Sequence, residues 1–437
     1  MKRTAAFLLM LAATCTLLSG CYDGKEIDDQ TYVIAIGLDK GETNKLRMTL
    51  QYAIPLAMGS SGVSGGGGGG GGEGESKSIG SMTLECPSVY SGLNMVNNSV
   101  GKQVNLSHAK VMVFSEDLAK DGRMVMLTRA ITRGKEFRPN MVVAVSRGSA
   151  EDYLKSIKPR QEADPSKYYE LKFSGYKYTG FIDQTQLHDF FIKEESTGAQ
   201  AVAALVGVNT KNSTKEFSVG ESSAPQKNRP VPFEGDYLAG NLPKVGDIKG
   251  EAMGLAVFNG PKMVGELDGE ESTHYLMVTG KYGHAYVTFP DPIKKDFYIV
   301  VNLKQSRRPT YKIKLVDGKP NIKVEIKLEA DYMSIQSGIN YESEYNDIFE
   351  RSAEKYLEEG IKRLLNRTSA EFHSDIFGFG NQYKSRFLTW DQWKNFQWLD
   401  RYKNSTFEVA VDVKVRRTGL TIRNAPIQGS EGEVQSP

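Results

Sequence analysis

The fold class is decided by the stretch between residues 110 and 157. It begins with a short apolar run, Lys110-Val111-Met112-Val113-Phe114, and a second apolar run at 140–145 follows a helical segment at 116–131. Another helical segment, 150–157, comes next. Apolar strands that alternate with helices are typical of βαβ units, in which the strands pair in parallel. We therefore predict a first α/β domain, residues 21–160, with a mostly parallel sheet packed with helices.

Segments before this stretch extend the first domain. Residues 31–38 form an almost unbroken apolar run that suits a strand buried on both faces, and residues 45–54 alternate as a returning strand. Residues 88–100 carry a helical apolar face. The segment 59–80 contains eight consecutive glycines and has little to bury, so we predict a disordered loop. A phosphate-binding loop would need spaced glycines followed by Lys-Ser or Lys-Thr.

The middle region, residues 166–280, is predicted to be an α+β domain. Its elements are a helix at 185–193, a strand at 200–208, a mobile polar loop at 209–247, a hairpin around Asn259-Gly260-Pro261, and a helix followed by a strand within 270–279.

A C-terminal α+β domain is predicted for residues 281–424, followed by a disordered tail at 425–437. Apolar spacings of three and four predict a long helix at 345–365. Strands are predicted at 285–289, 297–304, 311–316, 321–332 and 407–415. The overall expectation is a mixed α+β and α/β chain of three domains, each a sheet packed with helices.

The N-terminus predicts a lipoprotein signal peptide, residues 1–20. Lys2 and Arg3 precede an apolar run at 5–18, which is shorter than the roughly 20 residues of a membrane span. Cys21 follows Leu18, Ser19 and Gly20, as in a bacterial lipobox. We expect a diacylglyceryl group on Cys21 and cleavage before it. Two or more acyl chains anchor a protein stably, so the mature protein should be held on the outer face of a membrane.

The charge balance argues against nucleic acid as a partner. Loss of residues 1–20 removes two basic residues and no acidic one, which leaves 53 of each. Phosphate binding needs a surplus of clustered Lys and Arg. Cys86 is the one cysteine left besides Cys21, so no intramolecular disulfide is expected. Cys86 precedes a predicted helix, where a thiol can be activated, but a small buried residue is the simpler interpretation.

No catalytic or metal-binding constellation is recognisable. The five histidines and the cysteines lack zinc spacing, and no Gly-x-Ser-x-Gly or Ser-x-x-Lys motif occurs. The acidic cluster Asp268-Gly269-Glu270-Glu271 suits acid–base chemistry, a calcium ion, or a turn leading into a helix N-terminus. Aromatic residues at 377–380 and at Trp390, Trp393 and Trp398 suit a ligand platform, a core or a protein interface.

Several short segments together carry a family resemblance. They are Cys21-Tyr22-Asp23 with Glu26-Ile27-Asp28-Asp29, residues 101–108, Phe137-Arg138-Pro139, residues 144–150 and 254–258, Leu267-Asp268-Gly269-Glu270-Glu271, Asp375-Ile376-Phe377-Gly378-Phe379-Gly380, Trp390 and residues 413–419. In this order the chain resembles the Ger(x)C lipoprotein family, the C subunits of spore germinant receptors. Tyr22, where the family usually has tryptophan, and the polyglycine segment depart from the pattern.

The resemblance implies a germination function without catalysis or cofactors. It implies three α/β-type domains on the outer face of the spore inner membrane. It also implies a complex with an A subunit, an ion channel, and a nutrient-sensing B subunit that resembles amino-acid transporters. The roles of the motif residues stay open: Arg138, Pro139, Asp268, Gly269, Glu270, Glu271, Gly378 and Gly380.

Two rival functions are weighed against this one. A lipid-anchored solute-binding protein of a transporter would have two similar α/β lobes, whereas the predicted regions here are unlike one another. A surface hydrolase would need a catalytic constellation that the sequence does not display.

Overall fold

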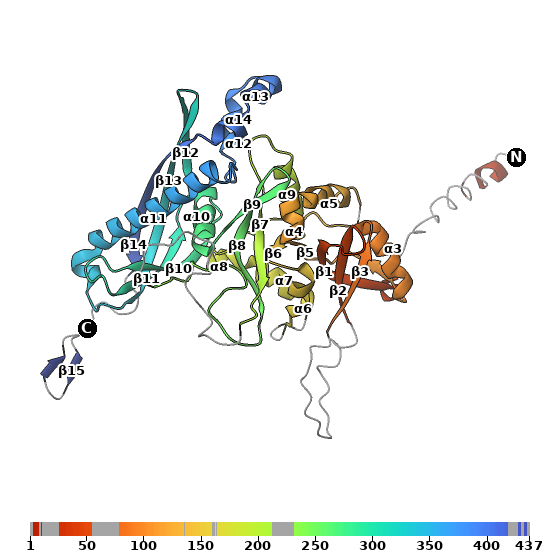
Figure 1. Ribbon diagram of the computed structural model, residues 1–437, viewed down its shortest axis with the longest axis horizontal. Helices are drawn as coiled ribbons and strands as arrows, with labels where there is room; N and C mark the ends of the chain where they lie inside the picture. Colours follow the sequence, from red (N-terminus) through yellow and green to blue (C-terminus); the bar gives the residue numbers. More distant parts are fainter. Residues whose placement is uncertain are drawn as a thin grey trace.

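The computed structural model describes residues 3–7, 10, 26–54, 78–134, 136–159, 162, 164–211, 231–417, 427–429 and 432–434. Within them, the chain builds two large sheets, each packed with helices (Figure 1). This confirms the predicted mixed α+β class. A short pair, β15 (Ile427–Gly429) with β16 (Gly432–Val434), lies in the segment that we predicted to be a disordered tail.

The first sheet has nine strands in the order β3-β2-β1-β5-β6-β7-β8-β9, with β4 paired to β1. Its centre, β1-β5-β6-β7, is parallel, as predicted, and its flanks are antiparallel. The strands are β1 (Gln30–Lys40), β2 (Leu46–Ala53), β3 (Ile79–Cys86), β4 (Gln103–Asn105), β5 (Val111–Ser115), β6 (Val142–Ser146), β7 (Val202–Val208), β8 (Gly250–Asn259) and β9 (Lys262–Leu267). β3 and β4 were not among the predicted strands.

Helices cover both faces of this sheet. Val143 and Val145 of β6 belong to one hydrophobic cluster, and Val142 and Ala144 belong to another, so neighbouring residues face opposite layers. The helices are α3 (Val89–Ser99), α4 (Glu116–Asp121), α5 (Arg123–Ile131), α6 (Ala150–Ser156), α7 (Pro165–Ser174), α8 (Tyr176–Thr179) and α9 (Leu187–Glu194), after a short 3₁₀ turn at Ile27–Asp29. The helical segment predicted at 116–131 is divided into α4 and α5 at Gly122, which has a positive φ of 86°.

One sheet runs through the two regions that we predicted to be separate domains. β6 pairs in parallel with β7, with Ala144 opposite Ala204, so the segment 160–166 separates no sheets. The described part of the predicted mobile loop, 231–247, also differs from expectation, because Leu238 and Ala239 are buried in the core. Residues 212–230 and most of the glycine-rich loop lie outside the described residues.

The second sheet has five strands, with β14 parallel to β13 and the other pairs antiparallel. Its strands are β10 (His284–Pro290), β11 (Tyr298–Gln305), β12 (Thr310–Val316), β13 (Lys319–Ile335) and β14 (Thr406–Arg417). The long helix α11 (Asn346–Ala370) follows a π-helical turn at Tyr341–Tyr345 and packs on this sheet. The short helices are α12 (Phe379–Tyr383), a 3₁₀ turn (Lys384–Arg386), α13 (Trp390–Phe396) and α14 (Trp398–Tyr402).

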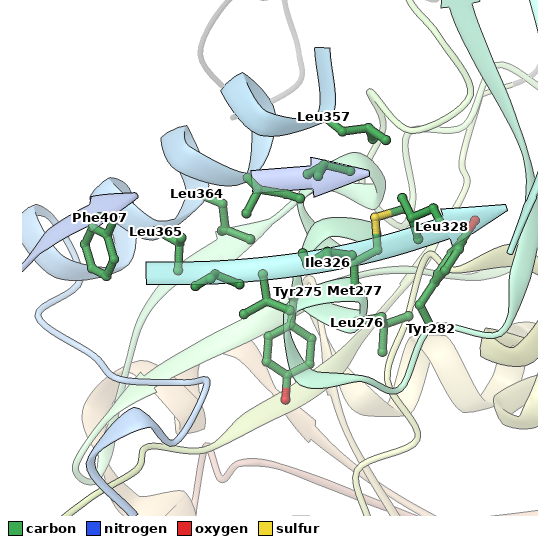
Figure 2. Packing of buried hydrophobic residues seen from close by; sticks show 14 of the residues in the cluster. Tyr275, Leu276, Met277, Tyr282, Ile326, Leu328, Leu357, Leu364, Leu365 and Phe407 are labelled. Carbon is green, nitrogen blue, oxygen red and sulfur yellow. The ribbon is translucent and has the colours of Figure 1, made fainter. Parts of the chain in front are cut away.

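Helix α10 (Gly269–Thr279) joins the two sheets. It is helical throughout and ends at Gly280, with a φ of 73°, so the strand predicted in its second half is wrong. One hydrophobic cluster includes α10 together with Leu255 of the first sheet and Val324 of the second. Figure 2 shows part of this cluster, with labelled side chains from α10 (Leu276, Met277), β13 (Ile326, Leu328) and α11 (Leu364, Leu365).

Candidate functional site

The acidic cluster at 268–271 forms the N-terminus of α10. The Asp268 carboxylate accepts a hydrogen bond from the backbone N of Glu271 at 2.8 Å, and the Glu271 carboxylate accepts one from the backbone N of Asp268 at 3.2 Å. This reciprocal pair is a capping box. It corresponds to one of the three interpretations of this cluster given above, a turn that leads into a helix N-terminus.

The same cluster ties α10 to α11. Arg367 Nη1 lies 2.7 Å from both carboxylate oxygens of Glu271, and the two side chains are 15% and 12% exposed. The Tyr356 hydroxyl donates to Glu270 Oε1 at 2.7 Å. Both partners belong to α11, so the acidic residues hold the long helix against the connection between the sheets.

A small cavity lies beside this junction. Its lining includes Glu270, Thr273 and His274 from α10, together with Tyr356 from α11 and Phe233. Its volume of about 30 Å³ accommodates about two water molecules.

The motif at 375–380 is organised around a buried carboxylate. Asp375 accepts hydrogen bonds from the backbone N of Gly378 at 2.9 Å, Phe379 at 3.2 Å and Gly380 at 2.9 Å, and from the Trp398 indole at 2.8 Å. Burial raises the pKa of Asp375 to about 6, and the four donors oppose that rise.

Both motif glycines are required by this geometry. Gly378 has a φ of 77°, a conformation that glycine adopts readily. A Cβ on Gly380 would lie inside van der Waals contact of the Trp398 ring. Trp393 and Trp398 are buried among other aromatic rings, whereas Trp390 is exposed. Two of the three tryptophans are therefore part of the core, which was one of the three interpretations of the sequence.

Arg138 and Pro139 lie on an exposed loop before β6. The Pro139 carbonyl accepts from the backbone N of His188 at 3.0 Å, and the Arg138 carbonyl accepts from the backbone N of Met141 at 3.2 Å. The first contact holds the start of α9 (Leu187–Glu194), and the second closes a turn before β6. The motif residues thus belong to three parts of the fold: this loop before β6, the N-terminus of α10, and the segment that leads into α12.

The predicted lipidation site, Cys21, and the lipobox residues Leu18, Ser19 and Gly20 lie outside the described residues. Among the helices that the structure describes, none is long and apolar enough to cross a membrane. Cys86 is buried, and burial raises the pKa of its thiol, which favours the protonated, unreactive form. Across the described ranges, no group of three His, Cys, Asp or Glu side chains is placed to hold a metal ion.

A set of charged groups beside α10 was not among the predicted site residues. Lys281 Nζ lies 2.6 Å from Asp183 Oδ2, and Lys193 Nζ lies 3.4 Å from the Tyr275 hydroxyl. Burial lowers the pKa of Lys193 to about 8. These residues come from separate segments of the chain, and no local motif connects them.

Comparisons with known proteins match most of this chain. Residues 23–208 match the family described as the spore germination protein N-terminal domain, and residues 253–419 match spore germination B3/GerAC-like, C-terminal. Spore germination protein KC of Bacillus subtilis is 23% identical, across 98% of each chain. Spore germination protein B3 of the same organism is 20% identical, across 96% of this chain and 98% of the relative.

A solved structure shares the fold. The crystal structure of the GerBC protein superposes with a TM-score of 0.51 at 15% identity, over 87% of this chain and 96% of that one.

Proposed function

The chain belongs to the Ger(x)C family of spore germinant receptor C subunits, and on that premise we propose that it is the lipid-anchored C subunit of a nutrient germinant receptor. In this proposal the protein is held on the outer face of the spore inner membrane through Cys21. It assembles there with an A and a B subunit. It acts in germination through protein–protein contacts rather than by turnover of a substrate.

The observation that carries this proposal is the extent of the match. The two family domains occur in order at residues 23–208 and 253–419, and the relatives align over nearly their whole length. The match therefore includes both family domains rather than one of them alone.

The geometry of the motifs supports a role in contacts. Asp268 and Glu271 cap a helix, and Glu271 also pairs with Arg367. Asp375 accepts three hydrogen bonds from the backbone of residues 378–380 and one from Trp398 of α14. Each of these carboxylates has structural partners in the fold. An acid or base for catalysis would need to be free to reach a substrate, whereas these carboxylates accept hydrogen bonds that hold the fold.

Affinity capture from spore membranes tests the assembly. The tagged chain, solubilised in mild detergent, should bring down an ion-channel-like and a transporter-like membrane protein. Cys21→Ala should leave a folded protein that detergent-free fractionation finds outside the membrane pellet, since acyl chains supply most of the affinity of such proteins for membranes. Cys86→Ala is the matched control, because it removes a buried thiol and keeps the anchor.

Two results together would contradict the receptor role. The tagged chain would bring down no membrane protein, and spores from which the gene is deleted would germinate normally. Isothermal titration with amino acids separates the rival function, because a solute-binding protein would bind one of them and the proposed C subunit would not.

A further inference from the structure

One end of the second sheet exposes apolar side chains that are not part of the core. We define this end, the hairpin–helix tip, as residues 310–319 of the β12–β13 hairpin and residues 384–403 around α13 and α14; both lie at the top of Figure 1. Leu388 is 94% exposed, Val316 is 55% exposed and Trp390 is 54% exposed. Folding leaves these side chains in water, so they are available for an external contact.

The two segments of the tip are fixed to one another. Asp317 and Gly318 have φ values of 50° and 76° and connect Val316 with Lys319, a two-residue turn that favours a rigid hairpin. Arg401 Nη1 donates to the Gly318 carbonyl at 2.9 Å, and its Nε donates to the Phe396 carbonyl at 2.9 Å. The turn and the short helices therefore form one surface.

The tip is strongly basic, although the predicted mature chain is neutral. It carries eight basic side chains and three acidic ones. The basic residues are Lys312, Lys314, Lys319, Lys384, Arg386, Lys394, Arg401 and Lys403, and the acidic ones are Asp317, Asp391 and Asp400. All of the lysines are exposed. The net positive charge of the hairpin–helix tip, which also exposes apolar side chains, attracts an anionic surface.

Trp390 combines an exposed apolar ring with a neighbouring positive charge. Trp393 and Trp398 are 2% and 1% exposed, so Trp390 is the one exposed tryptophan of the three in the chain. The Lys384 ammonium lies 4.5 Å from the centroid of the Trp390 ring. A tryptophan beside lysines suits the level of lipid headgroups, where the ring is partly buried and the ammonium groups meet phosphates.

We propose that the hairpin–helix tip binds the surface of an anionic lipid bilayer, with Leu388 and Trp390 inserted at the level of the headgroups and the lysines on the phosphates. A protein partner fits the tip less well, because lysine is depleted from protein interfaces whereas lysine clusters beside apolar side chains are typical of lipid-binding surfaces. This contact is separate from the acyl anchor proposed at Cys21, and it does not depend on the receptor role.

Vesicle binding tests the proposal. The probe is the predicted mature chain, residues 21–437, with Cys21→Ser so that no acyl chain contributes, and vesicles of phosphatidylcholine with or without phosphatidylglycerol. We expect co-sedimentation with the anionic vesicles only, weakening as salt is raised. Tryptophan fluorescence should shift to shorter wavelength on binding. Trp390→Phe should abolish that shift while the protein still sediments, because Trp393 and Trp398 are already buried.

Charge and insertion are tested by separate variants. One lysine near an anionic surface contributes about fivefold to the binding constant, so Lys312→Glu with Lys314→Glu should weaken binding by at least about tenfold. Leu388→Asp should weaken it by about tenfold or more through lost apolar burial. The matched control is Lys45→Glu with Lys102→Glu, two exposed lysines outside the tip, which should change binding by less than about twofold.

Thermal unfolding confirms that each variant is folded. Any of three results would overturn the proposal. The protein would not bind anionic vesicles, or it would bind neutral vesicles equally well, or the control pair of substitutions would weaken binding as much as the pair in the tip.

Discussion

Glu354 Oε1 lies 3.1 Å from the backbone N of Val413, so a side chain of α11 accepts a hydrogen bond from a backbone N–H of the edge strand β14. The contact repeats along the pair of elements: Glu350 accepts from Val415 at 2.8 Å, and Glu358 accepts from Val411 at 3.0 Å. Four helical residues advance about 6 Å, and two strand residues advance about 6.6 Å. Because these spacings match, three glutamates of α11 cover alternate N–H groups of β14 and block pairing with another strand.

We predict that Glu354→Ala lowers the free energy of unfolding by about 1–3 kcal/mol, because it leaves a partly buried backbone donor without an acceptor. Glu354→Gln keeps an acceptor oxygen and should cost less. Glu359→Ala is the control, since Glu359 is exposed on the same helix. Denaturant unfolding measures all three. Equal effects of Glu354→Ala and Glu359→Ala would mean that the strand edge gains nothing from the glutamate.

A second prediction concerns the contact between α10 and α11. A Cβ on Gly360 would lie inside van der Waals contact of the buried His274 ring. Glycine to alanine within a helix normally stabilises by about 1 kcal/mol, but Gly360→Ala should destabilise here by forcing the helices apart. In the background of His274→Ala, Gly360→Ala should recover most of that loss. Thermal melts of the four proteins decide this, and a loss that persists without the ring would place the clash elsewhere.

Local patterns predicted most of the elements. The helix at 345–365 is recovered as α11, with Phe349, Ala353 and Leu357 buried as its spacing indicates. The apolar runs at 110–114 and 140–145 became β5 and β6. Such elements are readable because a single face or a continuous run fixes their burial.

The elements that were missed depend on tertiary pairing. β3 has side chains of intermediate exposure and is a strand because Thr83 and Leu84 pair with Thr49 and Met48 of β2. The motif residues were found by resemblance, but their contacts could not be predicted. Arg367 lies far along the chain from Glu271, and nothing in the local sequence of either residue indicates the pair.

A third prediction links stability to pH through Glu151. Burial acts to raise the pKa of Glu151, but hydrogen bonds from Lys155, Arg47 and Thr83 outweigh it and lower the pKa to about 2. Because the pKa of Glu151 is lower in the folded protein than its ordinary value of 4.5, ionised Glu151 stabilises the fold fully at pH values above 4.5. This stabilisation is lost as the pH falls toward 2. Glu151→Gln should therefore cost about 2 kcal/mol at pH 7 and progressively less between pH 4.5 and 3. If the loss of unfolding free energy caused by Glu151→Gln stays constant over this pH range, the charge of Glu151 is not what stabilises the fold.

The last prediction asks whether the cluster at 268–271 does more than hold the fold. Replacing Asp268, Glu270 and Glu271 by their amides keeps the shapes and removes any acid–base or calcium-binding role. Asparagine is still a good N-cap, so most of the cost should come from Glu271, whose carboxylate pairs with the largely buried Arg367. We expect a loss of about 3 kcal/mol in the free energy of unfolding and germination reduced only as far as the amount of folded protein falls.

Arg367→Gln is the matched variant for this test. It breaks the same pair from the side of α11 and leaves all three acids in place. If the cluster is structural, the triple amide and Arg367→Gln should lose similar stability and similar germination, and a lower temperature should restore both. A triple amide that accumulates normally and assembles with its partners, yet fails to germinate where Arg367→Gln germinates, would mean that the carboxylates themselves carry out chemistry or bind an ion.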